Sequence, residues 1–382
     1  PPSLRDDLSL VFDVPAMAVL PREIGAFVAS EPVSIDEGLA KANELIAASK
    51  APAIVGMNGL TIEAVREAVA LAESKRMRLL PLPLPDVIAA RQVVTQTATL
   101  GHAIAADLQI KRQPTADGPR PTADVADRID AFITARVPNT LFMPVDDLDA
   151  VLALRAKVRE IGAKVFTEAT ALPVKRVIVL LPCDCDARVV SQWHRLAVEV
   201  QQAIRIAVLS LPSPDAGNIR GAIEAITWQT GLSCATGGVD FGDGAPRPCA
   251  GATALLERGV VDLVIDTGMH VLPDALASRV PRRIRIGSEP DAKADVSFVT
   301  PGLSVGLATQ VMRFDGVMLW LCEEAAGAVE DPVVGLMRRM QEVVSPSLQP
   351  SPRGRGSQIM TDMLRITHGR VYDPANGLDG EV

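Results

Sequence analysis

The sequence predicts an α/β fold in which parallel β-sheets are covered by helices. Apolar residues make up 48% of the 382 residues but aromatic residues only 3%. Ala, Val, Leu and Ile must therefore fill the core, which is typical of sheets covered by helices. Strand and helix patterns alternate along most of the chain, and residues 260–266 form a near-continuous apolar run. Such a run is expected for a strand at the centre of a parallel sheet.

The length of the chain exceeds what one hydrophobic core usually organises, so the sequence predicts more than one compact unit. We expect a main α/β domain formed by residues 1–104 and 173–344, with a smaller inserted α/β lobe at residues 105–172. Residues 345–382 are expected to be a linker and a tail strand, because residues 345–359 are rich in Ser, Pro, Gly and Arg.

A β-α-β unit is predicted near the start of the main domain. Ser34 and Glu37 have the spacing of a capping box, and Thr61 precedes a second amphipathic stretch. The predicted elements are a helix at 35–49, a strand at 53–56, a helix at 61–75 and a strand at 79–82. A unit of this kind implies that its two strands pair in parallel.

Further elements follow the same alternation. Residues 112–124 lack apolar periodicity and predict an exposed loop. Either Asp146 or Asp147 is expected to cap a helix that ends near Gly162. In chain order, helices are predicted at 121–134, 147–162, 187–202 and 332–344, and strands at 141–144, 164–166, 176–181, 206–209, 260–266, 284–287, 296–300 and 364–367.

Charge and hydropathy exclude several classes of partner. The formal net charge of −8 argues against binding to nucleic acid or to an anionic membrane, since both need clustered Lys and Arg. The sequence has no apolar stretch approaching the ~20 residues that span a bilayer, and residues 1–7 show no signal-peptide pattern. We therefore expect a cytoplasmic protein.

The cysteines and histidines are too few and too scattered for a metal site. A cluster needs four converging thiolates, and structural zinc needs paired Cys or His ligands. Cys183 and Cys185 alternate across an extended segment and are interpreted as small residues at a strand end. The sequence thus predicts reduced thiols and no metal in this chain. The residues concerned are Cys183, Cys185, Cys234, Cys249, Cys322, His102, His194, His270 and His368.

Two features remain as candidate ligand contacts. His270 follows the central strand, where α/β sheets place ligand loops. The glycines Gly237 and Gly238 begin a Gly-rich stretch that either lets the backbone approach a ligand or forms a turn, and we favour the turn. The sequence contains neither a P-loop nor a G-x-G-x-x-G motif.

The stretch Thr227-Trp228-Gln229-Thr230-Gly231 resembles the B subunit of formylmethanofuran dehydrogenase. Softer matches that span most of residues 50–320 are 61–64, 97–101, 250–262, 268–273 and 313–317. The resemblance implies a molybdopterin-oxidoreductase-like fold, here without the cluster domain or the C-terminal β-barrel. The family's B subunit holds a molybdenum- or tungsten-pterin, a 4Fe-4S cluster and a metal-ligating Cys. Residues 82–91 contain no Cys where that ligand is expected, so both cofactors are predicted to be absent from this chain.

The resemblance is strongest to the bacterial relative of this subunit, in the formyltransferase/hydrolase complex. That relative implies a non-catalytic scaffold whose partners are an amidohydrolase-like, metal-dependent A subunit, a C subunit and a formyltransferase D subunit. The complex converts formyl-tetrahydromethanopterin to formate through a methanofuran-type carrier. One alternative is a catalytic dehydrogenase B subunit with its molybdenum- or tungsten-pterin.

Another alternative is a vestigial pterin- or methanofuran-binding module. The candidate pocket residues are Trp228, Gln229, Thr230, Gly231, Gly237, Gly238 and His270. For Trp228 and Gln229 we favour packing between helix and sheet. Replacing Trp228 by Ala is then expected to cost about 3–5 kcal/mol of stability.

Residues 364–382 resemble the opening of the A subunit, with Met360 or Met363 as a start. Three explanations remain open: a natural fusion of the B and A subunits, an artificial boundary of the chain, or a sequence that continues into a neighbouring reading frame. If the segment is natural, we expect it to add an edge strand to the A subunit's small β domain.

Overall fold

The computed structural model describes residues 24–81, 99–113, 125–170, 173–182, 185–212, 217–234, 237–268, 272–301, 303, 309–312, 318–320, 330–342, 365–367, 370–373 and 378–381. They belong to two compact units, Pro1–Glu342 and Val343–Val382. Most of the loop expected at 112–124, and all of the linker expected at 345–359, lie outside the described residues.

The largest sheet has nine strands in the order β10-β9-β4-β3-β11-β12-β13-β1-β2. Strands β4, β3, β11, β12 and β13 run parallel, and the strands at both edges join antiparallel. Their bounds are β1 Gly25–Val28, β2 Glu31–Val33, β3 Pro52–Val55, β4 Arg78–Leu80, β9 Gly238–Asp240, β10 Arg247–Cys249, β11 Leu263–Asp266, β12 Arg282–Gly287 and β13 Val296–Val299. The predicted apolar run ends in β11, which lies in the middle of the sheet, so its central position is confirmed.

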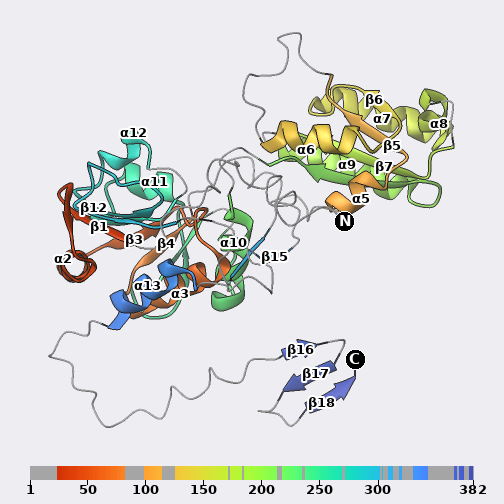
Figure 1. Ribbon diagram of the computed structural model, residues 1–382. Helices are drawn as coiled ribbons and strands as arrows, with labels where there is room; N and C mark the ends of the chain where they lie inside the picture. Colours follow the sequence, from red (N-terminus) through yellow and green to blue (C-terminus); the bar gives the residue numbers. More distant parts are fainter. Residues whose placement is uncertain are drawn as a thin grey trace. The chain divides into compact units, whose positions relative to one another are not determined.

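Helices cover both faces of this sheet (Figure 1). They are α2 Ile35–Ala48, α3 Ile62–Lys75, α10 Ile219–Thr230, α11 Ala252–Glu257, α12 Asp274–Ala277 and α13 Pro332–Glu342. Alternate strand residues point to opposite faces: Ile54 and Ile265 pack into the core under α2, α3, α10 and α13, whereas Val55 and Val264 pack against α11 and α12. The predicted α/β class, with sheets covered by helices, is confirmed.

The predicted helix starts at α2 and α3 are also confirmed. Ser34 Oγ accepts a hydrogen bond from the Glu37 amide at 3.2 Å, and the Ser34 amide donates to Glu37 Oε2 at 3.0 Å. Thr61 Oγ1 accepts from the Ala64 amide at 3.2 Å. Each of these hydroxyls satisfies an amide that the first turn of a helix leaves without an intrahelical partner.

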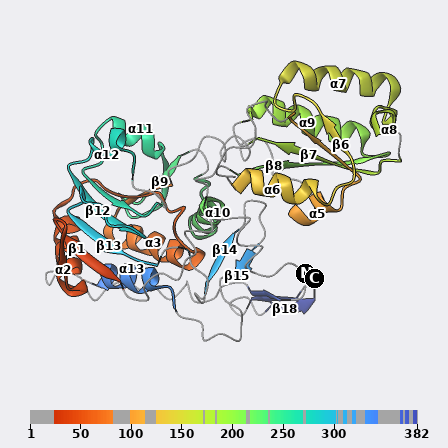
Figure 2. The same cartoon turned by 45° about the horizontal axis from the view of Figure 1, so that its top comes forward.

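A second sheet is entirely parallel, with the order β6-β5-β7-β8. Its strands are β5 Leu108–Lys111, β6 Thr140–Phe142, β7 Arg176–Leu181 and β8 Arg205–Ser210, and its helices are α5 Leu100–Ile104, α6 Val125–Thr134, α7 Leu148–Ile161, α8 Lys164–Thr170 and α9 Ala187–Val200. Figure 2 shows α7 and α9 on one face of this sheet and α5 and α6 on the other. Strands β7 and β8, which are expected in the main domain, instead pair in this sheet. The lobe's sheet therefore continues past the boundary expected at residue 172.

The strand predicted at 164–166 is wrong, because these residues begin α8. Val165 and Phe166 are both buried in the same core cluster. Neighbouring residues of a strand would point to opposite faces, so a helix is what allows both side chains to enter one core.

Several elements were not predicted. Besides β1, β2, β5, β9, β10, α5 and α10 to α12, they include a two-stranded antiparallel sheet of β14 Gln310–Met312 and β15 Met318–Trp320. The second compact unit contains an antiparallel meander of β16 Arg365–Thr367, β17 Arg370–Asp373 and β18 Leu378–Glu381. The tail strand expected at 364–367 is β16. Within the described parts of the chain, no helix has the length and apolar character needed to cross a membrane.

An ion-pair network joins α7 to α9. Arg155 donates to both Gln192 and Glu199, and Arg159 Nη2 lies 2.7 Å from Glu199 Oε1. The Arg155 hydrogen bond, with help from Arg159, lowers the pKa of Glu199 to about 2. Because the pKa is lower in the folded state than the ordinary value of 4.5, the carboxylate stabilises the fold above that value and loses this effect as the pH falls towards about 2.

We therefore expect Glu199→Gln to remove part of the acid sensitivity of folding. The urea midpoint of the parent should fall more between pH 6 and pH 3 than the midpoint of the variant. Other carboxylates titrate equally in both proteins, so the difference isolates Glu199. Parallel midpoint curves for the two proteins would contradict the assignment.

Candidate functional site at the carboxyl ends of the main sheet

The main sheet has its topological switch point between β3 and β11. The chain leaves β3 through α3 to reach β4 on one side, and it leaves β11 to reach β12 and then β13 on the other side. Ligands of open α/β sheets bind outside the carboxyl ends of the strands at such a point. The loops that follow β3 and β11 are therefore the first place to look for a site.

These two loops contact each other directly. Gly56, which follows β3, has a φ of +99°, and a Cβ atom there would lie 2.5 Å from Gly268 N and 2.7 Å from Gly268 Cα. Thr267 Oγ1 accepts from the Met57 amide at 3.0 Å and donates to the Val55 carbonyl at 3.1 Å. Both Met57 and Thr267 are buried. The described loop residues thus fill the space between the two strand ends with their own atoms.

Asn218, just before α10, fixes the loop that follows β3. Its amide N–H donates to the Asn58 carbonyl at 2.8 Å. Its side chain donates from Nδ2 to the Leu60 carbonyl at 2.7 Å and accepts at Oδ1 from the Met312 amide of β14 at 2.8 Å. The residue is completely buried. Three segments that are distant in sequence are therefore joined by one side chain.

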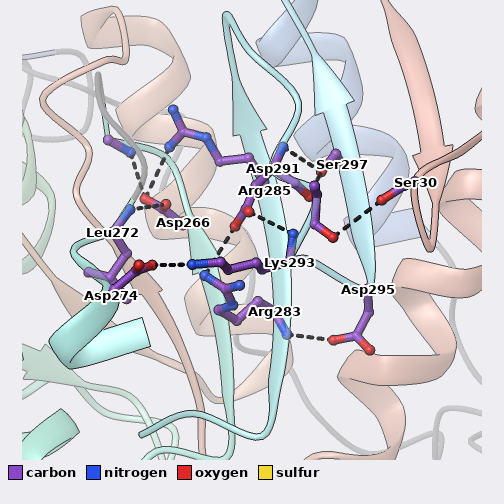
Figure 3. Close-up of polar contacts among 12 residues, drawn as sticks. Ser30, Asp266, Leu272, Asp274, Arg283, Arg285, Asp291, Lys293, Asp295 and Ser297 are labelled. Atoms are coloured by element: carbon purple, nitrogen blue, oxygen red, sulfur yellow. Dashed lines mark hydrogen bonds and ion pairs between the residues drawn. The ribbon is translucent and has the colours of Figure 1, made fainter. Parts of the chain in front are cut away.

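Asp266 holds the loop that follows β11 (Figure 3). Its carboxylate accepts from the Gly268 amide at 3.1 Å and the Leu272 amide at 2.9 Å, and Oδ1 lies 3.1 Å from Arg285 Nη1 of β12. Burial raises the pKa of Asp266, against the opposing effect of Arg285. The two amides flank His270, which lies outside the described residues.

A second buried ion pair lies beside the first (Figure 3). Arg283 Nη1 is 3.0 Å from Asp291 Oδ2, and both side chains are only 8% exposed. Asp291 Oδ1 also accepts from the Lys293 amide at 2.8 Å, and Lys293 Nζ pairs with Asp274 at 2.7 Å. A buried charge is tolerated only when it is paired and hydrogen-bonded, and these charges neutralise one another within the chain.

The prediction that Trp228 packs between helix and sheet is wrong. Its side chain is 60% exposed, and Gln229 and Gly231 beside it are exposed as well. The buried face of α10 carries Ile219, Ala222, Ile223 and Ile226, and position 228 points away from that face at 3.6 residues per turn. Thr230 is half-buried and donates to the Ile226 carbonyl at 2.8 Å, and Gly231 ends the helix with a φ of 70°.

Trp228→Ala is therefore expected to change the free energy of unfolding by less than about 0.5 kcal/mol, in place of the larger loss expected for a packed indole. Chemical denaturation of the full chain measures this, with the buried Trp193 as the reference. Trp193 is fully buried, donates from Nε1 to the Val145 carbonyl at 2.8 Å, and should lose about 3–5 kcal/mol on replacement by Ala. Similar losses at the two positions would contradict the assigned exposure.

Gly237 and Gly238 belong to the β9 edge and its close packing. A Cβ atom on Gly238 would lie 2.5 Å from the Leu79 carbonyl oxygen and 3.0 Å from Cys249 Sγ, and one on Gly237 would collide with the Cys249 carbonyl oxygen. Glycine is thus required by the neighbouring strands β4 and β10. The turn favoured from the sequence lies further on, where Gly244 has a φ of +90° between β9 and β10.

The described Cys and His side chains that were considered as metal ligands contribute to the fold instead. Cys185 and Cys234 are buried, and burial raises the pKa of Cys249 to about 11. His102 accepts from the Thr99 amide at 3.2 Å as part of the start of α5. Cys183, Cys322 and His368 lie outside the described residues. In the described ranges, no group of three or more His, Cys, Asp or Glu is placed to hold a metal ion.

Comparison with known proteins gives no match to a protein-family model and none to a curated protein. A solved structure that does match is a chain of the "X-ray crystal structure of the formyltransferase/hydrolase complex (FhcABCD) from Methylorubrum extorquens in complex with methylofuran", with a TM-score of 0.62, 17% sequence identity and coverage of 83% of this chain and 97% of that chain. A putative aspartate carbamoyltransferase from Leishmania major aligns with a TM-score of 0.12, which is too low to support an argument. The chain therefore shares the fold of a subunit of the formyltransferase/hydrolase complex.

Proposed function

We propose that this chain is a non-catalytic scaffold subunit of a formyltransferase/hydrolase complex. The complex converts formyl-tetrahydromethanopterin to formate through a methanofuran-type carrier. Its other members are an amidohydrolase-like A subunit that carries the metal, a formyltransferase D subunit and a C subunit. The single observation that carries the proposal is the fold match, which covers 97% of a chain from such a complex.

The contacts at the switch point support a structural role for this chain. A ligand site needs polar groups that converge on open space. Here the side chains of Thr267, Asn218 and Asp266 direct their hydrogen bonds to the chain's own backbone, and the backbones at Gly56 and Gly268 are in contact. At the place where open α/β sheets bind ligands, these side chains instead hold the sheet's own loops together.

Elemental analysis separates the scaffold from a catalytic dehydrogenase subunit. We expect the purified full chain to contain no stoichiometric molybdenum, tungsten or iron, and formyl hydrolysis to require the co-expressed A and D subunits. The co-purified complex serves as the control, since its A subunit should bring a metal with it. One equivalent of molybdenum or tungsten in the isolated chain would overturn the proposal and favour the catalytic alternative.

A further inference from the structure

A groove runs along the surface between α7 and α9. Its volume is about 440 Å³, and its lining residues are Arg155, Ser191, His194, Arg195, Val198 and Glu199. Ser191, His194, Arg195 and Val198 are three or four residues apart along α9, so they share one face of that helix. We call this feature the α7–α9 groove.

Apolar side chains are exposed along the groove and beside it. Val198 is 63% exposed. On α7, Leu152 is 40% exposed and lies one turn before Arg155, on the same side of the helix. The two helices pack together beneath these side chains through the core that holds Val158 and Leu196. The groove thus presents apolar surface on a rigid pair of helices.

The charge around the groove is positive. Arg155 and Arg159 share one carboxylate, that of Glu199. Arg195 has no acidic partner within the described parts of the chain, and its side chain is exposed. Burial lowers the pKa of His194, so its imidazole is neutral at pH 7. Two guanidinium groups therefore share one carboxylate, and a third, that of Arg195, adds a positive charge, on a chain whose formal net charge is −8.

We propose that the α7–α9 groove docks an acidic amphipathic helix of another protein subunit. A helix fits between two helices when its apolar side chains enter the groove, and residues at i and i+3 or i+4 of such a helix would cover Val198 and Leu152. A Glu or Asp on its flank would then pair with Arg195. The proposal deepens the scaffold role, because a scaffold needs a surface for its partner, but the docking chemistry stands on the groove alone.

Fluorescence anisotropy with the full chain and two labelled synthetic peptides tests the proposal. Both peptides carry Leu at i, i+3 and i+7, and they differ only in having Glu or Lys on the flank. We expect the Glu peptide to bind at least tenfold more tightly than the Lys peptide. Val198→Asp should weaken binding at least tenfold, and Arg195→Glu should reverse the preference between the peptides.

Val260→Asp is the matched control, because Val260 is 41% exposed and lies outside the groove, just before β11. It should leave the affinity unchanged. Equal affinity for the two peptides, no binding of either, or equal losses for Val198→Asp and Val260→Asp would overturn the proposal. So would a dimer in sedimentation that Val198→Asp dissociates, because the occupant would then be a second copy. Each of these failures is separate from a failure of the scaffold role, which is judged by bound metal and co-purification.

Discussion

Replacing Asp266 by Ala is expected to lower the free energy of unfolding by about 3–5 kcal/mol, because it removes one partner of a buried ion pair. The Arg285 guanidinium is only 1% exposed and has Asp266 Oδ1 at 3.1 Å. The same change deprives the Gly268 and Leu272 amides of their acceptor. Urea denaturation followed by circular dichroism measures the loss.

Asp274→Ala is the control for that experiment. Asp274 also pairs with a cation, Lys293 at 2.7 Å, but the two side chains are 78% and 64% exposed. Water and salt screen such a surface pair, so the variant should unfold at the same urea concentration as the parent. A similar loss in both variants, or an unchanged Asp266→Ala protein, would contradict the role assigned to the buried pair.

Asn218→Ala is expected to lower the free energy of unfolding by about 2–6 kcal/mol. It leaves two buried backbone groups without a hydrogen-bond partner, at a cost of about 1–3 kcal/mol each. The Leu60 carbonyl would lose its donor and the Met312 amide its acceptor. Replacing Gln229 by Ala on the exposed end of the same helix is the matched control and should be nearly neutral. Thermal and urea unfolding of the two variants measure the difference, and a neutral Asn218→Ala would show that this side chain does not join the three segments.

Local features of the fold were predictable because their causes lie within a few residues. The capping box of Ser34 and Glu37 and the Thr61 cap were visible in the sequence and are present. The cap of α7, expected at either Asp146 or Asp147, is Asp147. The apolar run that ends in β11 indicated its central place, because only a strand covered on both faces is apolar throughout.

The sheet to which each strand belongs was less predictable, because the apolar pattern of a strand does not indicate which other strand it pairs with. The runs at β7 and β8 predicted strands correctly, yet the pairing of β7 with β5, and of β8 with β7, depends on contacts between distant segments. At 164–166 the short run Lys-Val-Phe carried no periodicity that separates strand from helix.

The residues that hold the switch-point loops were missed for a related reason. Asn218 and Leu60 are 158 positions apart, and Thr267 and Val55 are 212 apart. A sequence signal did exist for Asn218, since Asn is preferred directly before a helix, but its side chain makes no cap bond and instead joins other segments. Trp228 is a different kind of error. A large aromatic residue is expected to be buried, but this one is exposed.

Native mass spectrometry of this chain, purified with its co-expressed neighbours, tests the scaffold role most directly. We expect one stoichiometric assembly that contains this chain with amidohydrolase-type and formyltransferase-type subunits, and a mass for the dissociated chain that equals the mass of its polypeptide. A chain that stays apart from those subunits, or one whose native mass includes a molybdenum- or tungsten-pterin, would contradict it.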